Sequence, residues 1–326
     1  MILVKLRIQI INICSSIIEL RDIYHWRDSM KLLTFDVGGT EIKYAVADEK
    51  MNFTDKGYVP TPMDTFEQFS DVIYGIYEKH KDEVEGIAMC LPGFIDVKNG
   101  RCNGGGGLLY NHGTDVGKLL QERCGCKIVL ENDAKAAILA EYYRGSLKGC
   151  ENAAVFIIGT GVGGGLIIDS KIVRGTHFRA GEFSFVITKA DQYDQKHAVM
   201  AESCSTRAML INYAKKCGSE ELISGREFFK RLPDDPLAEE AFDELCTNIA
   251  VQIYNLSWLL DLEKIAIGGG ISQQPIVTER IREKFAEVIS KSSAGHMNLP
   301  MHIQIVPCAF YNDANLIGAF INYTLN

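Results

Sequence analysis

No run of lysine or arginine residues occurs in this sequence, and its charge balance is negative. The 326 residues include 34 Lys and Arg against 42 Asp and Glu, which gives a net charge of −8. An acidic protein is repelled by the phosphate backbone of DNA or RNA. We therefore expect no nucleic-acid partner.

The sequence also lacks paired Cys-x-x-Cys motifs. Its ten cysteines are scattered, which predicts free thiols in a reducing compartment, the cytoplasm, rather than a disulfide framework. The closest pair, Cys124 and Cys126, flanks Gly125 before an apolar run. Two thiolates cannot complete a tetrahedral zinc shell, and no partner ligands lie nearby in the sequence, so metal binding there is not favoured.

A long apolar run is missing as well. The apolar residues 8–18 follow two basic residues, as in a signal peptide, but polar residues interrupt them and no small-residue cleavage site follows. The run is too short to span a bilayer as a helix, so we expect no membrane association. Met30 stands directly before the apolar residues 32–35. We therefore hypothesise that translation begins at Met30 and that residues 1–29 are a mis-assigned leader or a disordered extension.

Two segments of the sequence resemble each other. Residues 32–48 and 155–169 each contain an apolar run, a glycine-rich turn and a second apolar run, which predicts a β-hairpin in both places. A duplicated strand–turn–strand unit indicates two lobes of related topology. The chain has 326 residues, 47% of them hydrophobic, and is long enough to form two cores.

Strand and helix patterns alternate along the rest of the chain. Short apolar runs predict central strands at residues 86–90, 127–130, 264–267 and 303–306. Apolar residues at helical spacing predict helices over residues 66–76, 242–256 and 314–323. Polar clusters predict surface loops at residues 232–236 and 290–295. The alternation predicts an α/β protein with mixed sheets.

The glycine-rich residues 159–165 are compatible with two kinds of structure. In a dinucleotide-binding loop the glycines lead from a strand into a helix, whose N-terminus faces the pyrophosphate. Here they lead into another apolar strand, residues 166–168, which argues against a dehydrogenase. A hairpin tip remains, and its exposed N–H groups can approach phosphate oxygens because glycine has no Cβ. Taken alone, such a hairpin is equally a plain tight turn.

The first hairpin adds a carboxylate to its glycine turn. Asp36 ends a strand directly before the turn 37–40, a position from which it can hold Mg²⁺ through water. Thr40 supplies a hydroxyl and an N–H group to phosphate. An isolated motif of this kind is commonly an Asx-type turn, but the two glycine loops together favour a nucleotide site. Residues 268–270 follow a strand and precede a helix, where an adenine ring or ribose can lie on the backbone.

In their order along the chain, these motifs resemble the ROK family of bacterial sugar kinases and repressors, within the wider actin/hexokinase-like ATPase fold. The matching residues span 31 to 323 and comprise 36–40, 91–93, 131–134, 159–165, 181–182, 268–270 and 312–319. The resemblance implies a two-lobed α/β fold, ribonuclease H-like, with mixed sheets and a cleft between the lobes. It implies a small lobe of residues 30–133 with 313–326 and a large lobe of residues 134–312. It also implies a homodimer whose lobes close over a sugar and the γ-phosphate of ATP.

The same resemblance implies roles for individual residues. Asp133 matches the family's catalytic base, and a carboxylate aligned with a sugar hydroxyl can accept its proton during attack. The sugar-binding positions that it implies are Gly93, Asn132, Glu182 and Glu202. The positions that it implies for ATP are Asp36, which also holds Mg²⁺ through water, and Gly38, Gly39, Thr40, Gly159, Thr160, Gly161, Gly163, Gly268, Gly269 and Gly270. Without the other motifs, residues 131–133 would indicate only a strand end followed by an Asp helix cap.

The sequence departs from the family at the family's zinc site. Many members carry a histidine where this chain has Phe185, followed by a cysteine triplet of which only Cys204 stands here. Phenylalanine cannot ligate a metal, so we expect no structural zinc. Residues 181–185 resemble a zinc-free branch that includes β-glucoside kinases. The Phe185 ring can stack on a sugar, leave room for an aglycone or belong to the core, and the glycine run 104–107 predicts a mobile loop beside the sugar site.

We therefore predict an ATP-dependent kinase that phosphorylates a hexose-type sugar. Glucose or a β-glucoside is favoured as the substrate, and N-acetylmannosamine comes next. A ROK-type repressor is disfavoured, because the 35 residues before Asp36 are too few for a helix-turn-helix domain. A non-catalytic sugar-responsive regulator and an ATPase with a non-sugar acceptor are the alternatives. The presence of both Asp36 and Asp133 favours catalysis over the regulator.

Overall fold

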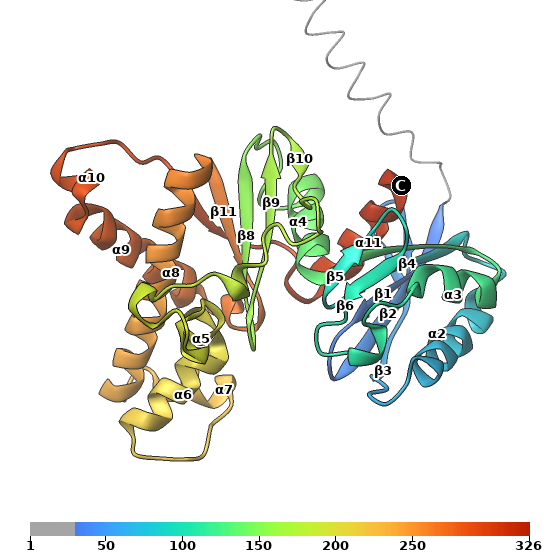
Figure 1. Cartoon of the computed structure of the whole chain (residues 1–326), viewed down its shortest axis with the longest axis horizontal. Helices are drawn as coiled ribbons and strands as arrows, with labels where there is room; N and C mark the ends of the chain where they lie inside the picture. The colour runs from blue at the N-terminus through green and yellow to red at the C-terminus, as the bar shows by residue number, and fades with distance from the viewer. Residues whose placement is uncertain (1–29) are drawn as a thin grey trace, which may run out of the picture.

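The computed structural model describes residues 30–326 and contains two five-stranded sheets (Figure 1). The strand order is β3-β2-β1-β4-β7 in the first sheet and β10-β9-β8-β11-β12 in the second. Each sheet therefore begins with an antiparallel hairpin and continues with parallel strands, so both are mixed. The leader hypothesis for residues 1–29 lies outside the described residues.

The first lobe is built on the hairpin of β1 (Lys31–Val37) and β2 (Glu41–Asp48), to which β3 (Phe53–Pro60) adds an edge. Strands β4 (Gly86–Leu91) and β7 (Lys127–Asn132) run parallel to β1, and every residue of β4 is buried. Successive side chains of β1 face opposite sides of the sheet. Leu33 and Phe35 pack with helices α2 (Phe66–His80) and α3 (Val116–Cys124), and Leu32 packs with the C-terminal helix α11 (Ala314–Leu325).

The second lobe repeats this plan. The hairpin of β8 (Ala153–Ile158) and β9 (Val162–Ile168) is extended by the short β10 (Lys171–Ile172). Strands β11 (Lys264–Gly268) and β12 (Gln304–Pro307) run parallel to β8. The larger core joins one sheet face to the helices α5 (Ala201–Cys204), α6 (Thr206–Lys216), α7 (Gly225–Arg231), α8 (Pro236–Leu260) and α9 (Pro275–Lys291).

Helix α4 (Asp133–Arg144) links the two lobes. It follows β7 directly, packs on β9 and lies against α11 between the sheets (Figure 1). Two glycines permit these close contacts. A Cβ on Gly318 would lie 1.8 Å from the Ala136 carbonyl oxygen, and one on Gly165 would lie 2.5 Å from the Ile138 side chain. The N-terminus of α4, and with it Asp133, is thereby held where the lobes meet.

The structure confirms the two predicted hairpins, the four central strands and the three helices. Most ends lie within a few residues of the expected ones, but the helix expected over residues 242–256 extends from Pro236 to Leu260. It also confirms that a strand, not a helix, follows the glycines 159–161, because β9 begins at Val162. The predicted loop 290–295 is partly wrong. Helix α9 continues to Lys291, and Ser292 then caps the short helix α10 (Ser293–His296) by accepting from Gly295 N. The lobe boundaries proposed from sequence fall at the β7–α4 junction and within the turn η6 (Tyr311–Asp313).

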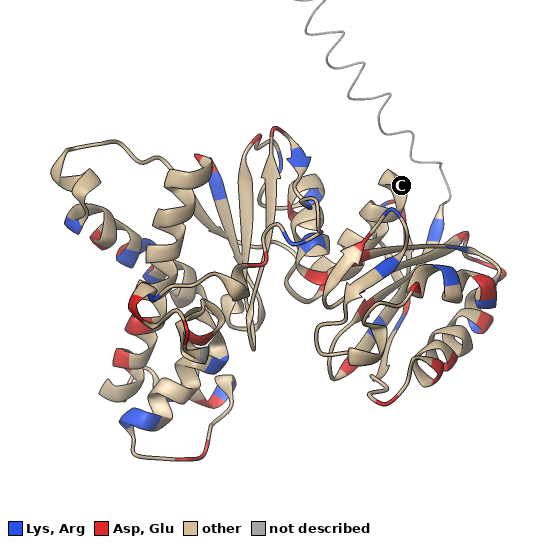
Figure 2. Cartoon of the chain, viewed as in Figure 1, with Lys and Arg blue, Asp and Glu red and all other residues tan. Residues whose placement is uncertain are grey.

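Figure 2 shows that residues of both charges are interleaved along helices of both lobes. On α8 and α9 they pair across the helix interface, where Lys284 Nζ lies 2.6 Å from Asp243 Oδ2. The nine cysteines within residues 30–326 are free thiols. None of the helices in this range has the length and apolar character needed to cross a membrane.

Candidate active site

A cavity of about 660 Å³ opens where the two lobes meet at the N-terminus of α4. It brings together residues from both glycine hairpins, from the β7–α4 junction and from the turn η2 (Phe183–Phe185). The predicted site residues in its lining are Gly39, Thr40, Gly93, Asn132, Asp133, Gly159, Thr160, Gly161, Gly163 and Glu182. Segments far apart in the sequence thus converge on one hollow, which is the expected geometry of a binding site.

Asp133 is the first residue of α4, and its carboxylate lines the cavity. Its pKa is raised to about 6, mainly by burial and in part by the nearby carboxylates of Asp36 and Glu182, against a hydrogen bond from Ala134 N and the charge of Lys135. A carboxylate with a pKa near 6 is ionised at neutral pH yet more basic than an ordinary aspartate. It is therefore suited to accept a proton from a hydroxyl group.

Asn132, and not Asp133, caps the helix. Asn132 Oδ1 accepts from Lys135 N at 3.1 Å, while its Nδ2 donates to the Gly93 carbonyl at 2.9 Å. The alternative interpretation of residues 131–133 was that Asp133 is the helix cap. Because Asn132 occupies the N-cap position, the Asp133 carboxylate is not needed there. Gly93 has φ +103°, and a Cβ there would lie 1.7 Å from the Gly104 oxygen, so this close approach requires glycine.

Glu182 enters the cavity from the second lobe and is held by a buried lysine. Lys135 Nζ donates to Glu182 Oε1 at 2.9 Å, and the Lys135 side chain is only 2% exposed. A buried ammonium group is costly unless it is paired. The pair therefore fixes the Glu182 carboxylate relative to α4, two residues along from Asp133.

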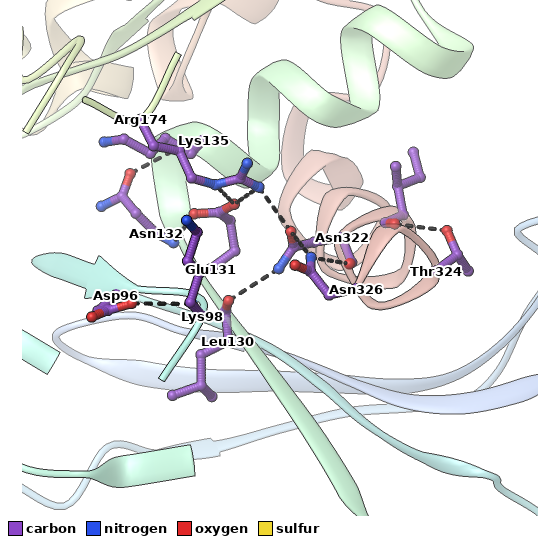
Figure 3. Close-up of polar contacts among 11 residues, drawn as sticks. Asp96, Lys98, Leu130, Glu131, Asn132, Lys135, Arg174, Asn322, Thr324 and Asn326 are labelled. Atoms are coloured by element: carbon purple, nitrogen blue, oxygen red, sulfur yellow. Dashed lines mark hydrogen bonds and ion pairs between the residues drawn. The ribbon is translucent and has the colours of Figure 1, made fainter. Parts of the chain in front are cut away.

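A second buried ion pair supports the strand that precedes Asp133 (Figure 3). The Arg174 guanidinium, from the segment after β10, donates from Nε at 3.0 Å and from Nη2 at 2.6 Å to Glu131 Oε2. The same Nη2 donates to Asn322 Oδ1 on α11, and Asn322 Nδ2 donates to the Leu130 carbonyl. Burial raises the pKa of Glu131, and the charge of Arg174 opposes that rise. The pair ties the second lobe and α11 to the end of β7.

The tip of the first hairpin is fixed by backbone and side-chain contacts. Thr61 Oγ1 donates to the Gly38 carbonyl at 2.8 Å, and Thr61 N donates to the Thr40 carbonyl at 3.0 Å. Gly39 and Thr40 line the cavity, whereas the predicted residues Gly38 and Asp36 are outside its lining. Asp36 Oδ1 accepts from Asn315 Nδ2 at 2.9 Å, and Asn315 itself lines the cavity.

The second hairpin tip is held by Ser184. Its Oγ accepts from Val162 N at 3.0 Å and donates to the Val162 carbonyl at 2.8 Å. Gly163 and Gly165 on β9 have a different role from the glycines of the hairpin tip. A Cβ on Gly163 would crowd Ala134, and a Cβ on Gly165 would crowd Ile138, both on α4. These glycines let α4 approach the sheet and so bring Asp133 beside the tip.

Some predicted residues lie away from this cavity. Glu202 lines a separate hollow of about 420 Å³, where its carboxylate is 3.8 Å from both Arg207 and His197. Gly268 is the last residue of β11, Gly269 and Gly270 follow it, and all three lie outside the lining of the main cavity. Gly269 has φ +94° and packs against the Ile158 backbone, which explains the requirement for glycine there without a ligand.

The two residues that correspond to the family's zinc site differ in burial. Phe185 is 67% exposed, which excludes the alternative that its ring belongs to the core. Cys204 is buried, with its Sγ 3.6 Å from Ser203 Oγ. Within residues 30–326, the one group of at least three side chains with metal-like spacing is Asp55, His80 and Glu83, and neither Cys124 nor Cys126 belongs to it.

The match to a family model decides the family. A model described as the ROK family covers residues 32–324. The chain belongs to the ROK family. The β-glucoside kinase of Klebsiella pneumoniae is 28% identical over 297 residues, which cover 90% of this chain and 96% of the relative. The N-acetyl-D-glucosamine kinase of Photobacterium profundum is 27% identical over 272 residues, which cover 78% of this chain and 88% of the relative.

Solved structures confirm the fold. A ROK family glucokinase from Streptomyces griseus, in complex with glucose and AMPPNP, matches with a TM-score of 0.76 at 25% identity, over 89% of this chain and 97% of that one. The mixed α/β architecture predicted from sequence is therefore the actin/hexokinase-like fold of the ROK sugar kinases.

Four residues of the site were not assigned roles from the sequence. Asn315 lies within the ROK-like stretch 312–319, which is the signal that could have found it. Ser184 likewise lies within the resembling stretch 181–185. Lys135 and Arg174 had no such signal, because each acts through a contact with a residue distant in sequence.

Proposed function

We propose that the protein is an ATP-dependent kinase that phosphorylates a hydroxyl group of a hexose-type sugar, with Asp133 as the general base. The observation that carries this proposal is the position of the Asp133 carboxylate, in one cavity with the tips of two glycine hairpins. A phosphate group and a hydroxyl group can both be bound there, and a proton acceptor lies at the same place.

In the proposed reaction, the sugar hydroxyl attacks the γ-phosphorus of ATP while its proton moves to an Asp133 oxygen. The new bond joins the sugar oxygen to phosphorus, and the bond between that phosphorus and the β,γ-bridging oxygen breaks, so that ADP leaves. Alignment and charge stabilisation supply most of the acceleration in phosphoryl transfer, and a general base adds to them. The Lys135–Glu182 and Arg174–Glu131 pairs supply alignment by fixing both sides of the cavity.

The described residues fit ATP and Mg²⁺. N–H groups at the hairpin tips, at Gly39, Thr40 and Gly161, border the cavity and suit phosphate oxygens. Asp36 Oδ1 accepts from Asn315, which lines the cavity, and Asp36 Oδ2 lies 3.9 Å from Lys43 Nζ. The Asp36 carboxylate would hold the metal by accepting from a metal-bound water. When bound, Mg²⁺ would neutralise charge on the transferring phosphoryl group.

Glucose or a β-glucoside is our favoured substrate, and an N-acetylated hexosamine such as N-acetylmannosamine comes next. The name of the Klebsiella pneumoniae relative and the glucose in the Streptomyces griseus complex support the first. The name of the Photobacterium profundum relative supports the amino-sugar class. The free thiols of residues 30–326 are typical of a reducing compartment, and we propose that the enzyme works in the cytoplasm.

Release of ADP from Mg·ATP, measured over a panel of sugars, tests the proposal. The panel contains glucose, β-glucosides, N-acetylmannosamine and N-acetyl-D-glucosamine. We expect one class to stimulate ADP release strongly. Equal ADP release with and without sugar would indicate an ATPase with another acceptor. Binding of a sugar without any ADP release would indicate the regulatory alternative.

A further inference from the structure

A second hollow adjoins the candidate active site and shares Glu182 with it. It measures about 480 Å³ and is lined by Phe94, Arg179, Glu182, Phe185 and Val186. Apart from the two charged groups, its walls are apolar. Because Glu182 lines both hollows, a ligand that fills the main cavity can extend past this carboxylate into the second one.

The exposure of Phe185 is imposed by the two residues before it. Phe183 is buried, with its ring centroid 5.6 Å from that of Phe156, and Ser184 is bound at both its acceptor and donor sides to Val162. The turn is thus fixed on one side by the core and at its centre by β9. Phe185 is left pointing outward, 67% exposed.

The opposite wall comes from the other lobe. Phe94 belongs to β5 (Phe94–Asp96), and its ring centroid lies 6.2 Å from that of Phe185, at 57° between the ring planes. The Arg179 guanidinium lies 4.9 Å from the Phe94 centroid, a cation–π contact. A Cβ on Gly104 would lie 2.7 Å from the Phe94 ring, so the glycine run beside the cleft makes room for this aromatic side chain.

The side chains that line this hollow suit a ligand that contains a ring. Aromatic side chains stack on flat apolar faces, which both an aryl group and the C–H face of a sugar offer. Arg179 adds hydrogen-bond donors at the edge of the hollow. An exposed phenylalanine beside a polar cleft is costly in water and gains free energy when such a face covers it.

We propose that this hollow is a second subsite, which binds a ring-sized aglycone attached to the sugar that Asp133 activates. The proposal rests on the proposed kinase function and narrows its substrate class to glycosides. Phe185 stacks on the aglycone ring, Phe94 backs it from the other lobe, and Glu182 lies at the junction between the two rings.

The test compares specificity constants within one preparation, so that folding defects cancel. We would measure kcat/KM for glucose, methyl β-glucoside, phenyl β-glucoside and cellobiose with the wild type, Phe185→Ala and Phe185→Tyr. The exposed aromatic residue Tyr58, on β3, provides the control Tyr58→Ala. We expect the wild type to prefer a ring-bearing glucoside over methyl β-glucoside, and Phe185→Ala to reduce that preference about 10-fold. Phe185→Tyr should retain the preference and Tyr58→Ala should leave it unchanged.

Preference for phenyl β-glucoside identifies an aryl aglycone, and preference for cellobiose identifies a second sugar. Equal specificity constants for methyl β-glucoside and both ring-bearing substrates would overturn the subsite while leaving the kinase proposal intact. Retention of the wild-type preference by Phe185→Ala would also overturn the subsite and leave the kinase proposal intact. A failure of every sugar to be phosphorylated would instead contradict the proposed function itself.

Discussion

Lys135 and Glu182 form an ion pair across the candidate active site, with 2.9 Å between Lys135 Nζ and Glu182 Oε1. The lysine comes from the helix that begins at Asp133, and the glutamate comes from the turn that continues into Ser184 and Phe185. This single contact therefore joins the proposed base to the proposed sugar-binding side of the cleft. It also places a positive charge near three carboxylates.

Replacement of Lys135 tests how its charge affects Glu182 and the pKa of Asp133. Lys135→Met leaves Glu182 without its partner and removes the charge that lowers the pKa of Asp133. We expect the acid limb of the pH profile of kcat/KM to move to higher pH and the KM for sugar to rise. Loss of one partner of a buried pair costs about 3 kcal/mol of stability. Thermal melts should show a lower Tm, and Lys135→Met with Glu182→Gln should recover part of it. If the acid limb of the pH profile does not move in Lys135→Met, the assignment of Asp133 as a base whose pKa is lowered by Lys135 is contradicted.

The wild-type pH profile follows from Asp133. Burial raises its pKa to about 6, and only the ionised carboxylate can accept the hydroxyl proton. Activity is therefore retained above pH 6, and log(kcat/KM) should fall with decreasing pH below it, approaching a slope of about one per pH unit. Steady-state rates between pH 5 and 8, at saturating Mg·ATP, measure this. A flat profile over that range would mean that another group accepts the proton.

We predict that loss of the Arg174–Glu131 ion pair lowers both stability and turnover, although neither residue is placed in contact with the substrate. Glu131 is fully buried, and in Arg174→Met it keeps the hydrogen bond from Asn132 N but loses its charged partner, which should cost about 3–5 kcal/mol. Because Glu131 lies two residues before Asp133, kcat should fall more than the KM for ATP changes. Arg174→Lys should restore part of kcat.

Arg101→Met is the matched control for this prediction. Arg101 pairs with Asp115 on the surface, with both side chains at least 40% exposed, and an exposed pair contributes less than about 1 kcal/mol. Urea melts of the two variants compare the pairs directly. Equal stability of Arg174→Met and Arg101→Met would show that the buried pair is not a support for β7.

Local patterns predicted most of the fold, because each hairpin is specified by apolar residues around its own glycine turn. The position of Asp133 was also predictable, since its neighbours form a recognisable motif. The contact of Lys135 with Glu182 was not, because it joins residues 47 positions apart. Sequence order likewise did not reveal that Glu202 lines a separate hollow. Such outcomes depend on tertiary packing between elements distant in sequence, which no local pattern encodes.

The proposed role of Asp36 in holding Mg²⁺ predicts a metal requirement. Chelation of Mg²⁺ should abolish turnover, and Asp36→Asn should raise the Mg²⁺ concentration needed for half-maximal rate about 10-fold or more, since one anionic ligand group is lost. Because Phe185 offers no ligand atom, elemental analysis of tag-free protein should find no stoichiometric zinc. Unchanged Mg²⁺ dependence in Asp36→Asn would remove this residue from the metal site, and stoichiometric zinc would contradict the interpretation of Phe185.

The most direct test of phosphoryl transfer to a sugar is quantitative ³¹P NMR of a reaction with Mg·ATP and the best sugar of the panel. We predict that wild-type enzyme forms a sugar phosphate in equal amount to ADP. Asp133→Asn should form both about 10²–10⁴-fold more slowly, while binding ATP as the wild type does. Inorganic phosphate in place of a sugar phosphate, or near-wild-type turnover by Asp133→Asn, would contradict the proposed kinase mechanism.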